Sequence, residues 1–226
     1  MLHIYFFITF VCMKKSIDDT KYLENLVSEG EHQQQDFKYK VMDAAKLARS
    51  VSAFANTDGG RLLIGVRDDG HLSGVRSEEE IFMMHAAAWK YCRPESAIRF
   101  ETMHAGGKTI VVATIPPCAK KPVFALDEQG KRHAYIRRKD ENIVASPVHL
   151  EIWRQEQSRN GTFTTIADDE HRLMEALEEM PHISLNRLVR LSKVNRRKTI
   201  SILAKLCRFG LVEMEYTDHQ FLFSSK

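Results

Sequence analysis

The chain has 226 residues, of which 43% are hydrophobic and 28% charged, with a formal net charge of +3. This is the composition of an ordinary soluble protein that can bury one large core or two small ones. The four cysteines form no Cys-x-x-Cys pair, which argues against a disulfide framework and a cysteine zinc site and favours a cytoplasmic location.

Residues 1–17 form an N-terminal extension that opens with the apolar run MLHIYFFITFVC. The run is too short to span a bilayer, and no basic residue precedes it as a signal peptide requires. We expect a start-site artefact, with Met13 opening the working protein and no membrane contact. A cryptic membrane anchor is the alternative.

Residues 18–157 are expected to form one domain in which helices and strands mix without strict alternation. The expected elements are, in chain order, a helix over 18–28, a polar exposed strand over 31–39, a helix over 41–55, a buried strand over 62–66, a short strand over 71–75, a helix from Ser77 to 91, strands over 97–103 and 108–115, a hairpin over 123–126 and 133–137, and a helix from Ser146 to 157.

Residues 158–167 are polar and turn-rich, which predicts a linker to a second domain over 168–226. This domain begins with a helix over 168–180. Ser184 and Asn195 are typical N-caps for two further helices, and a hairpin over 211–223 follows. The predicted fold is therefore an α+β domain, a mixed sheet with flanking helices, followed by a small winged helix-turn-helix domain.

Residues 180–212 carry eight basic side chains and no acidic one, and nucleic acid is the commonest partner of such a local charge. The basic residues are Arg187, Arg190, Lys193, Arg196, Arg197, Lys198, Lys205 and Arg208.

The third helix of this domain is the predicted reader of duplex DNA. Arg197, Ser201, Lys205 and Arg208 recur on the side opposite its apolar stripe, and three basic residues crowd its first turn, where a recognition helix enters the major groove. A solvated basic face, or a winged helix used for protein contact, is the alternative. The hairpin tip has no Lys or Arg to grip phosphate.

The first domain carries a series of short motifs in a fixed order. The motifs are Gly30-Glu31, Asp36-Phe37-Lys38, Ala53-Phe-Ala-Asn-Thr-Asp-Gly-Gly60, Ile64-Gly-Val-Arg-Asp-Asp-Gly70, Gly74-Val75, Lys121-Pro122-Val123 and Tyr135-Ile-Arg-Arg138. This series resembles the Schlafen-type AlbA-like domain, once labelled a divergent ATPase domain, and the resemblance covers about residues 20–157. In bacteria such domains often precede a winged helix, and the proteins are usually described as transcriptional regulators.

The resemblance also implies a second function, because Schlafen relatives with ribonuclease activity use three acidic residues. The matching positions are Glu31, Asp36 and Asp68, which could hold Mg²⁺ or Mn²⁺ beside a phosphate. Asp36 stands where the family usually has Glu. Glu31 and Asp36 have opposite parity on a regular strand, so they can share a site only across a bulge or bend.

Lys38 and Arg137 lie within the family-like motifs and are the preferred phosphate contacts of this domain. The sequence does not support ATP binding, since it has no Gly-x-x-x-x-Gly-Lys-[Ser/Thr] motif. The leading hypothesis is thus a cytoplasmic, homodimeric DNA-binding regulator that requires no cofactor. The alternative is a metal-dependent ribonuclease acting on structured RNA.

Overall fold

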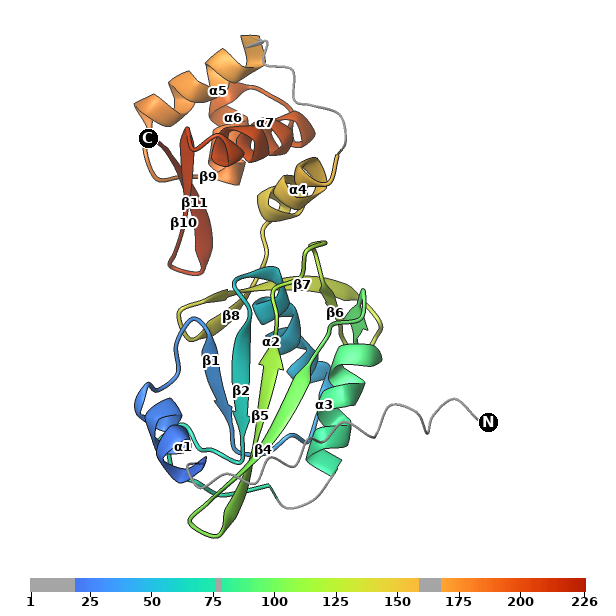
Figure 1. Cartoon of the computed structure of the whole chain (residues 1–226). Coiled ribbons are helices and arrows are strands. Elements are labelled where there is room, and N and C mark those ends of the chain that lie inside the picture. The colour runs from blue at the N-terminus through green and yellow to red at the C-terminus, as the bar shows by residue number, and fades with distance from the viewer. Residues whose placement is uncertain (1–18, 76–78, 159–167) are drawn as a thin grey trace, which may run out of the picture. The chain divides into compact units, whose positions relative to one another are not determined.

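A computed structural model describes residues 19–75, 79–158 and 168–226 (Figure 1). The chain divides into two compact units, Met1–Val144 and Ala145–Lys226. The N-terminal extension, Ser77 and nearly all of the expected linker lie outside the described residues. The division falls earlier than the expected boundary at 157, because the helix after Ser146 packs within the second unit.

A mixed four-stranded sheet organises the first unit. Its strand order is β1-β2-β5-β4, with β1 parallel to β2 and the other neighbours antiparallel. The α+β class is therefore confirmed. The strands are β1 (Gln35–Lys38), β2 (Gly60–Ile64), β4 (Arg99–Ala105) and β5 (Lys108–Ile115).

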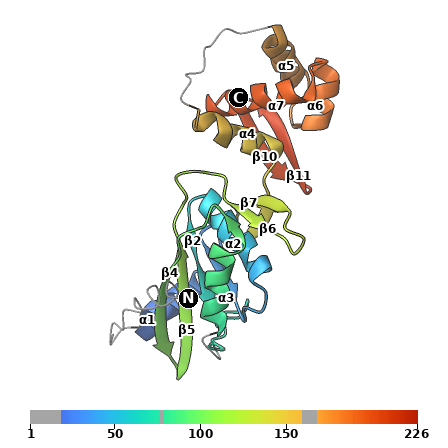
Figure 2. The same ribbon diagram turned by 90° about the vertical axis from the view of Figure 1, so that its right-hand side faces the viewer.

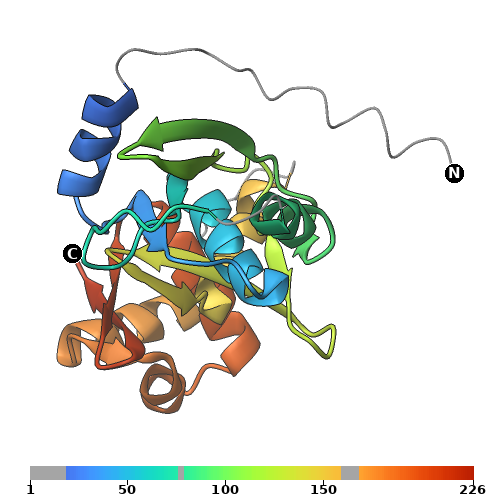
Figure 3. The same cartoon turned by 90° about the horizontal axis from the view of Figure 1, so that it is seen from below.

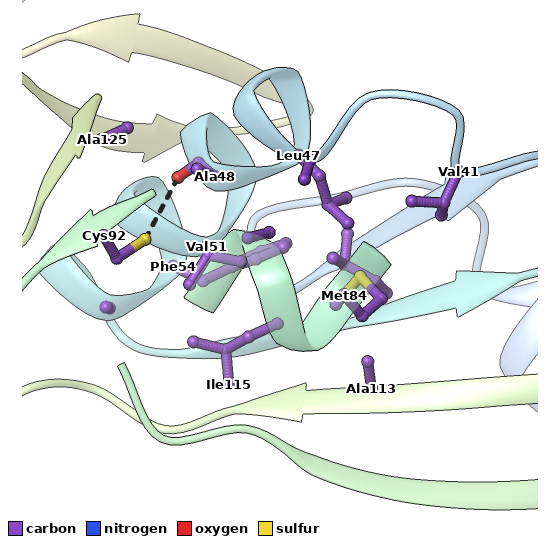
Figure 4. Packing of buried hydrophobic residues seen from close by; sticks show 14 of the residues in the cluster. Val41, Leu47, Ala48, Val51, Phe54, Met84, Cys92, Ala113, Ile115 and Ala125 are labelled. Atoms are coloured by element: carbon purple, nitrogen blue, oxygen red, sulfur yellow. Dashed lines mark hydrogen bonds between the residues drawn. The ribbon is translucent and has the colours of Figure 1, made fainter. Parts of the chain in front are cut away.

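Helices cover both faces of this sheet. Helix α1 (Asp19–Ser28) packs on one face, while α2 (Ala44–Asn56) and α3 (Glu79–Trp89) lie side by side on the other, as the views in Figures 2 and 3 show. Figure 4 shows the core on the α2 side, where Phe54 of α2 and Met84 of α3 lie in one buried cluster with Ile115 of β5. Burial of such side chains stabilises the fold by about 1.5–3 kcal/mol each.

A second four-stranded sheet, of order β3-β6-β7-β8, completes the first unit. Asn56 at the end of α2 joins the two layers. Its amide donates to the carbonyls of Val123 and Tyr135, each at 2.9 Å, and its Oδ1 accepts from Val123 N at 2.7 Å. The strands are β3 (Cys92–Arg93), β6 (Phe124–Leu126), β7 (Arg132–Arg138) and β8 (Glu141–Val144).

Two expectations for the first unit are wrong. The segment 31–39 is not an exposed strand: β1 covers only its second half, and Gln35, Asp36 and Phe37 are buried. The strand expected over 71–75 is a single bridge between Val66 and Leu72. The sequence also did not indicate β3 and β8, which are too short to show a period.

The second unit has the order of elements expected for residues 168–226, with one helix added at its start and a short strand, β9, added before its third helix. The elements are α4 (Pro147–Glu156), α5 (Asp168–Glu179), β9 (Ile183–Ser184), α6 (Leu185–Ser192), α7 (Arg196–Arg208), β10 (Val212–Thr217) and β11 (Gln220–Ser225).

In the second unit, β11 pairs with β10 on one side and with the short strand β9 on the other, which gives an antiparallel sheet of order β10-β11-β9. Val148 of α4 joins Leu173 of α5, Leu203 of α7 and Phe223 of β11 in one apolar core. Within the described ranges, no helix combines the length and apolar character needed to cross a bilayer.

Candidate nucleic-acid interface

Asp36 lies in a buried ionic cluster of the first unit. Its side chain is 5% exposed, and its two oxygens face two cations: Oδ2 lies 2.7 Å from Lys38 Nζ and Oδ1 lies 3.5 Å from Arg137 Nη2. Lys38 reaches this position because residues two apart on a strand share a face. The Asp36 carboxylate therefore forms ion pairs within its own domain and is buried rather than exposed to solvent.

Arg137 is held from several sides and has only 1% of its side chain exposed. Its Nη1 donates to Asn142 Oδ1 at 3.0 Å and its Nη2 to the Gln35 carbonyl at 3.1 Å, while the guanidinium lies 5.1 Å from the centre of the Phe54 ring. The prediction that Arg137 contacts phosphate is therefore wrong, because its charge does not reach the surface. Lys38, 33% exposed, is shared between Asp36 and the Phe37 carbonyl.

Glu31 reaches Asp36 from outside the strand. A tight turn, in which the backbones of His32 and Gln35 exchange hydrogen bonds, folds the chain back just before β1. The Glu31 carboxylate accepts a hydrogen bond from Phe37 N at 2.9 Å. Burial raises the pKa of Glu31 above its ordinary value, and a hydrogen bond with Asp36 raises it further. Because the chain bends between Glu31 and β1, the two carboxyl groups can face each other although they have opposite parity on a regular strand.

Asp68 is not grouped with these two carboxyls. It is exposed in the turn beyond the end of β2, whereas Asp36 is in register with Leu62 inside that strand. Among residues 19–75, 79–158 and 168–226, no three His, Cys, Asp or Glu side chains gather closely enough to hold a metal ion. The structure thus brings two of the three acidic candidates together, beside two cations.

In the second unit, the face of α7 that was expected to read DNA is partly occupied. Lys205 Nζ donates to both carboxylate oxygens of Glu170 in α5, at 2.8 and 3.1 Å, and both side chains are nearly buried. Gln155 of α4 donates to the Ser201 carbonyl at 2.9 Å and accepts from Arg208 at 3.4 Å. Because α4 and α5 cover this side, Ser201 and Lys205 are not available as expected.

The remaining basic side chains are exposed. Besides Arg208, two of them have partners within the unit: Arg196 donates to Asn186 at 2.5 Å, and Lys198 forms an ion pair with Asp169. That pair lowers the pKa of Asp169, first through the hydrogen bond from Lys198. Within the described parts of the chain, four of the basic residues have neither an ion pair nor a side-chain hydrogen bond: Arg187, Arg190, Lys193 and Arg197.

Local geometry gathers these cations around the turn between α6 and α7. The turn bends at Lys193, which adopts the left-handed conformation with φ of 55°. Asn195 then caps α7 by accepting from Lys198 N at 2.9 Å. The first turn of a helix leaves N–H groups without helical partners and carries the positive end of the helix dipole. This part of the surface is suited to bind anions.

Several partners of the candidate residues were not singled out from the sequence. Gln35 and Asn142 hold Arg137, and Gln155 and Glu170 occupy the α7 face. Only Glu170 gave a usable signal, as an acidic residue in the first turn of its helix. The others are neutral polar residues, and Gln35 and Gln155 are also distant in sequence from their partners.

The architecture is thus a mixed-sheet α+β domain with helices on both faces, followed by a small helical unit with an antiparallel sheet. Residues 31–146, just over half of the chain, match the family described as Schlafen, AlbA_2. The chain belongs to this family. Comparison with curated proteins gives no significant match.

Solved structures from Corynebacterium diphtheriae and Nitrosomonas europaea are among those similar to the chain. The DIP2311 protein from Corynebacterium diphtheriae matches with a TM-score of 0.46 and 16% identity over 77% of this chain and 42% of its own length. The N-terminal domain of a DNA helicase RecG-related protein from Nitrosomonas europaea matches with a TM-score of 0.40 and 22% identity over 64% of this chain and 94% of that domain. The chain therefore spans less than half the length of the first of these relatives.

Proposed function

We propose that the protein is a DNA-binding regulator of transcription that works in the cytoplasm and binds duplex DNA through its second unit. The observation that carries this proposal is the exposed basic surface around the α6–α7 turn, formed by Arg187, Arg190, Lys193 and Arg197. We call it the basic turn surface. Such a local charge neutralises phosphates and releases counterions, which is the main source of affinity for DNA.

The order of elements supports a winged helix-turn-helix assignment for the second unit, with α6 and α7 as the helix-turn-helix and the β10–β11 hairpin as the wing. In this motif the first helix crosses the backbone and the N-terminal residues of the second contact base edges. Arg187 and Arg190 on α6 would then contact phosphates. Arg197, in the first turn of α7, would then contact base edges.

The positions of α4 and α5 limit which part of α7 can contact DNA. They cover α7 around Ser201 and Lys205, so DNA meets the N-terminal end of α7 rather than its whole length. The wing adds little charge, since residues 209–225 contain no Lys or Arg and carry Glu213 and Glu215. Binding therefore depends on the basic turn surface.

A titration of the full chain with a labelled duplex of about 25 base pairs, read by fluorescence anisotropy, tests the proposal. We expect the triple variant Arg190→Ala, Lys193→Ala, Arg197→Ala to weaken binding by about tenfold to a hundredfold near physiological salt. The matched control is Lys120→Ala, Lys131→Ala, Arg132→Ala, which removes the same charge from exposed positions of the first unit.

Equal affinity of the wild type and the basic-turn variant would refute the proposal, as would an equal loss in both triple variants. A parallel titration with a structured RNA separates the two nucleic acids. Tighter binding of the RNA, lost in the same variant, would replace duplex DNA by RNA as the partner.

A further inference from the structure

Helix α3 is apolar on two opposite sides. Its inner side buries Met84 and Ala87 in the core, whereas Phe82 and Trp89 on its outer side are 70% and 68% exposed. Their seven-residue spacing places them on one stripe of the helix, with the exposed His85 between them. Single apolar residues are common on protein surfaces, but two large aromatic side chains on one stripe are typical of an interaction surface.

The edge of the main sheet continues this surface. The His85 ring lies 4.5 Å from the ring of Phe100 in β4. Strand β4 pairs with β5 on one side, and no named strand among the described residues pairs with it on the other. In Figure 1, β4 and α3 lie on the side of the unit away from β1. An unpaired edge strand offers N–H and C=O groups to another strand.

The side chains of β4 fit a second copy of the same strand. Arg99 and Glu101 flank Phe100, and both are exposed. When two β4 strands pair antiparallel with Phe100 opposite Phe100, Arg99 of each copy lies opposite Glu101 of the other. Opposite charges that face each other across strands stabilise the pair, and like charges destabilise it. The edge is thus complementary to itself in one register.

We propose that the protein forms a two-fold symmetric dimer in which α3 and β4 of one copy meet α3 and β4 of a second copy. An interface of this kind uses the same patch on both subunits. The strand pairing joins two four-stranded sheets into one, and association of the flanking helices buries the stripe of Phe82, His85 and Trp89. This inference does not depend on the binding of DNA.

Sedimentation velocity of the full chain, from about 1 to 100 μM, tests the dimer, because affinities in this range are typical of modest interfaces. The double variant Phe82→Ser, Trp89→Ser is expected to raise the dimer dissociation constant at least tenfold. The control is Met42→Ser, an 82% exposed apolar residue outside the patch, which should leave association unchanged. A monomeric wild type at all concentrations, or a dimer that the double variant leaves intact, overturns the proposal.

A charge swap tests the register. Glu101→Arg places two arginines opposite each other and should weaken the dimer, while adding Arg99→Glu restores opposite charges and should restore association. Because both side chains are exposed, each variant should keep its stability within about 0.5 kcal/mol, which thermal unfolding checks. A swap that fails to recover association relative to Glu101→Arg would rule out this pairing.

Discussion

Arg137 Nη2 of β7 lies 3.5 Å from Asp36 Oδ1 of β1, and the two side chains are 1% and 5% exposed. This contact joins the second sheet of the first unit to the edge strand of the main sheet. Both residues were candidates for contact with a metal ion or a phosphate. The ion pair gives them a structural role, and it predicts an effect on stability that a surface site would not have.

Asp36→Asn should destabilise the first unit by about 3–5 kcal/mol, because removing one partner leaves a buried charge uncompensated. Urea unfolding followed by circular dichroism measures the loss. Asp68→Asn is the matched control, since Asp68 is exposed in a turn, and should change stability by less than about 0.5 kcal/mol. Equal effects of the two substitutions would contradict the buried ion pair.

Glu31 should make stability depend on pH. Its pKa is raised in the folded protein by burial, then by its hydrogen bond with Asp36, so the folded state holds the proton more tightly than the unfolded state. The stabilisation is complete below the ordinary pKa of 4.5 and is lost as the pH rises through the raised value. Glu31→Gln mimics the protonated form, so it should gain stability over the wild type with rising pH. A constant difference between the two unfolding free energies would argue against this.

His149 should make the second unit sensitive to acid. Its Nδ1 accepts from Ser146 N at 3.2 Å at the start of α4, and its ring packs 5.0 Å from Phe221. Burial lowers its pKa from 6.5 to about 4. Because the unfolded chain takes up the proton first, stability is present above pH 6.5 and is lost as the pH falls toward 4.

The loss amounts to as much as about 3 kcal/mol, from the size of the pKa shift. His149→Gln keeps an acceptor for the cap and does not titrate, so its stability should fall less over the same pH range. Chemical unfolding at pH 7 and pH 4.5 makes the comparison. The same acid loss in both proteins would show that His149 is not responsible.

Asn56 should be essential to the joint between α2 and the second sheet. Asn56→Ala removes three hydrogen bonds to backbone groups of Val123 and Tyr135 and leaves the buried Val123 N–H without its partner, at a cost of about 2–4 kcal/mol. Asp58→Ala, two residues later and exposed, is the control and should change little. Thermal unfolding measures the stability of both variants. A loss in Asn56→Ala alone would show that Asn56 stabilises the contact between α2 and the second sheet, and an equal loss in both would contradict this.

Local signals predicted most of the elements well. Asn195 and the Ser146-Pro147 pair mark the starts of α7 and α4, and the Gly106-Gly107 turn marks the β4–β5 hairpin, because caps and turns depend on neighbouring residues. Helix α4 could be located from the sequence for this reason. Its place in the second unit could not be predicted, because it depends on distant side chains in the core.

The candidate sites were harder to predict, since burial depends on contacts between segments that are distant in sequence. Arg137 is buried through partners such as Gln35, 102 residues earlier in the chain. Lys205 carries a positive charge that could bind DNA phosphate, yet its ammonium group donates a hydrogen bond to Glu170 of another helix, α5. The basic character of residues 180–212 was clear from the sequence, but which cations remain at the surface is decided by packing.

The salt dependence of duplex binding tests the central claim most directly, that the basic turn surface binds DNA phosphates. For B-DNA, the slope of log K against log salt falls by about 0.9 for each phosphate contact. We predict that Arg190→Ala, Lys193→Ala, Arg197→Ala lowers the magnitude of this slope by about 2–3 relative to the wild type, from the loss of up to three contacts. A slope unchanged by these three substitutions would contradict the account.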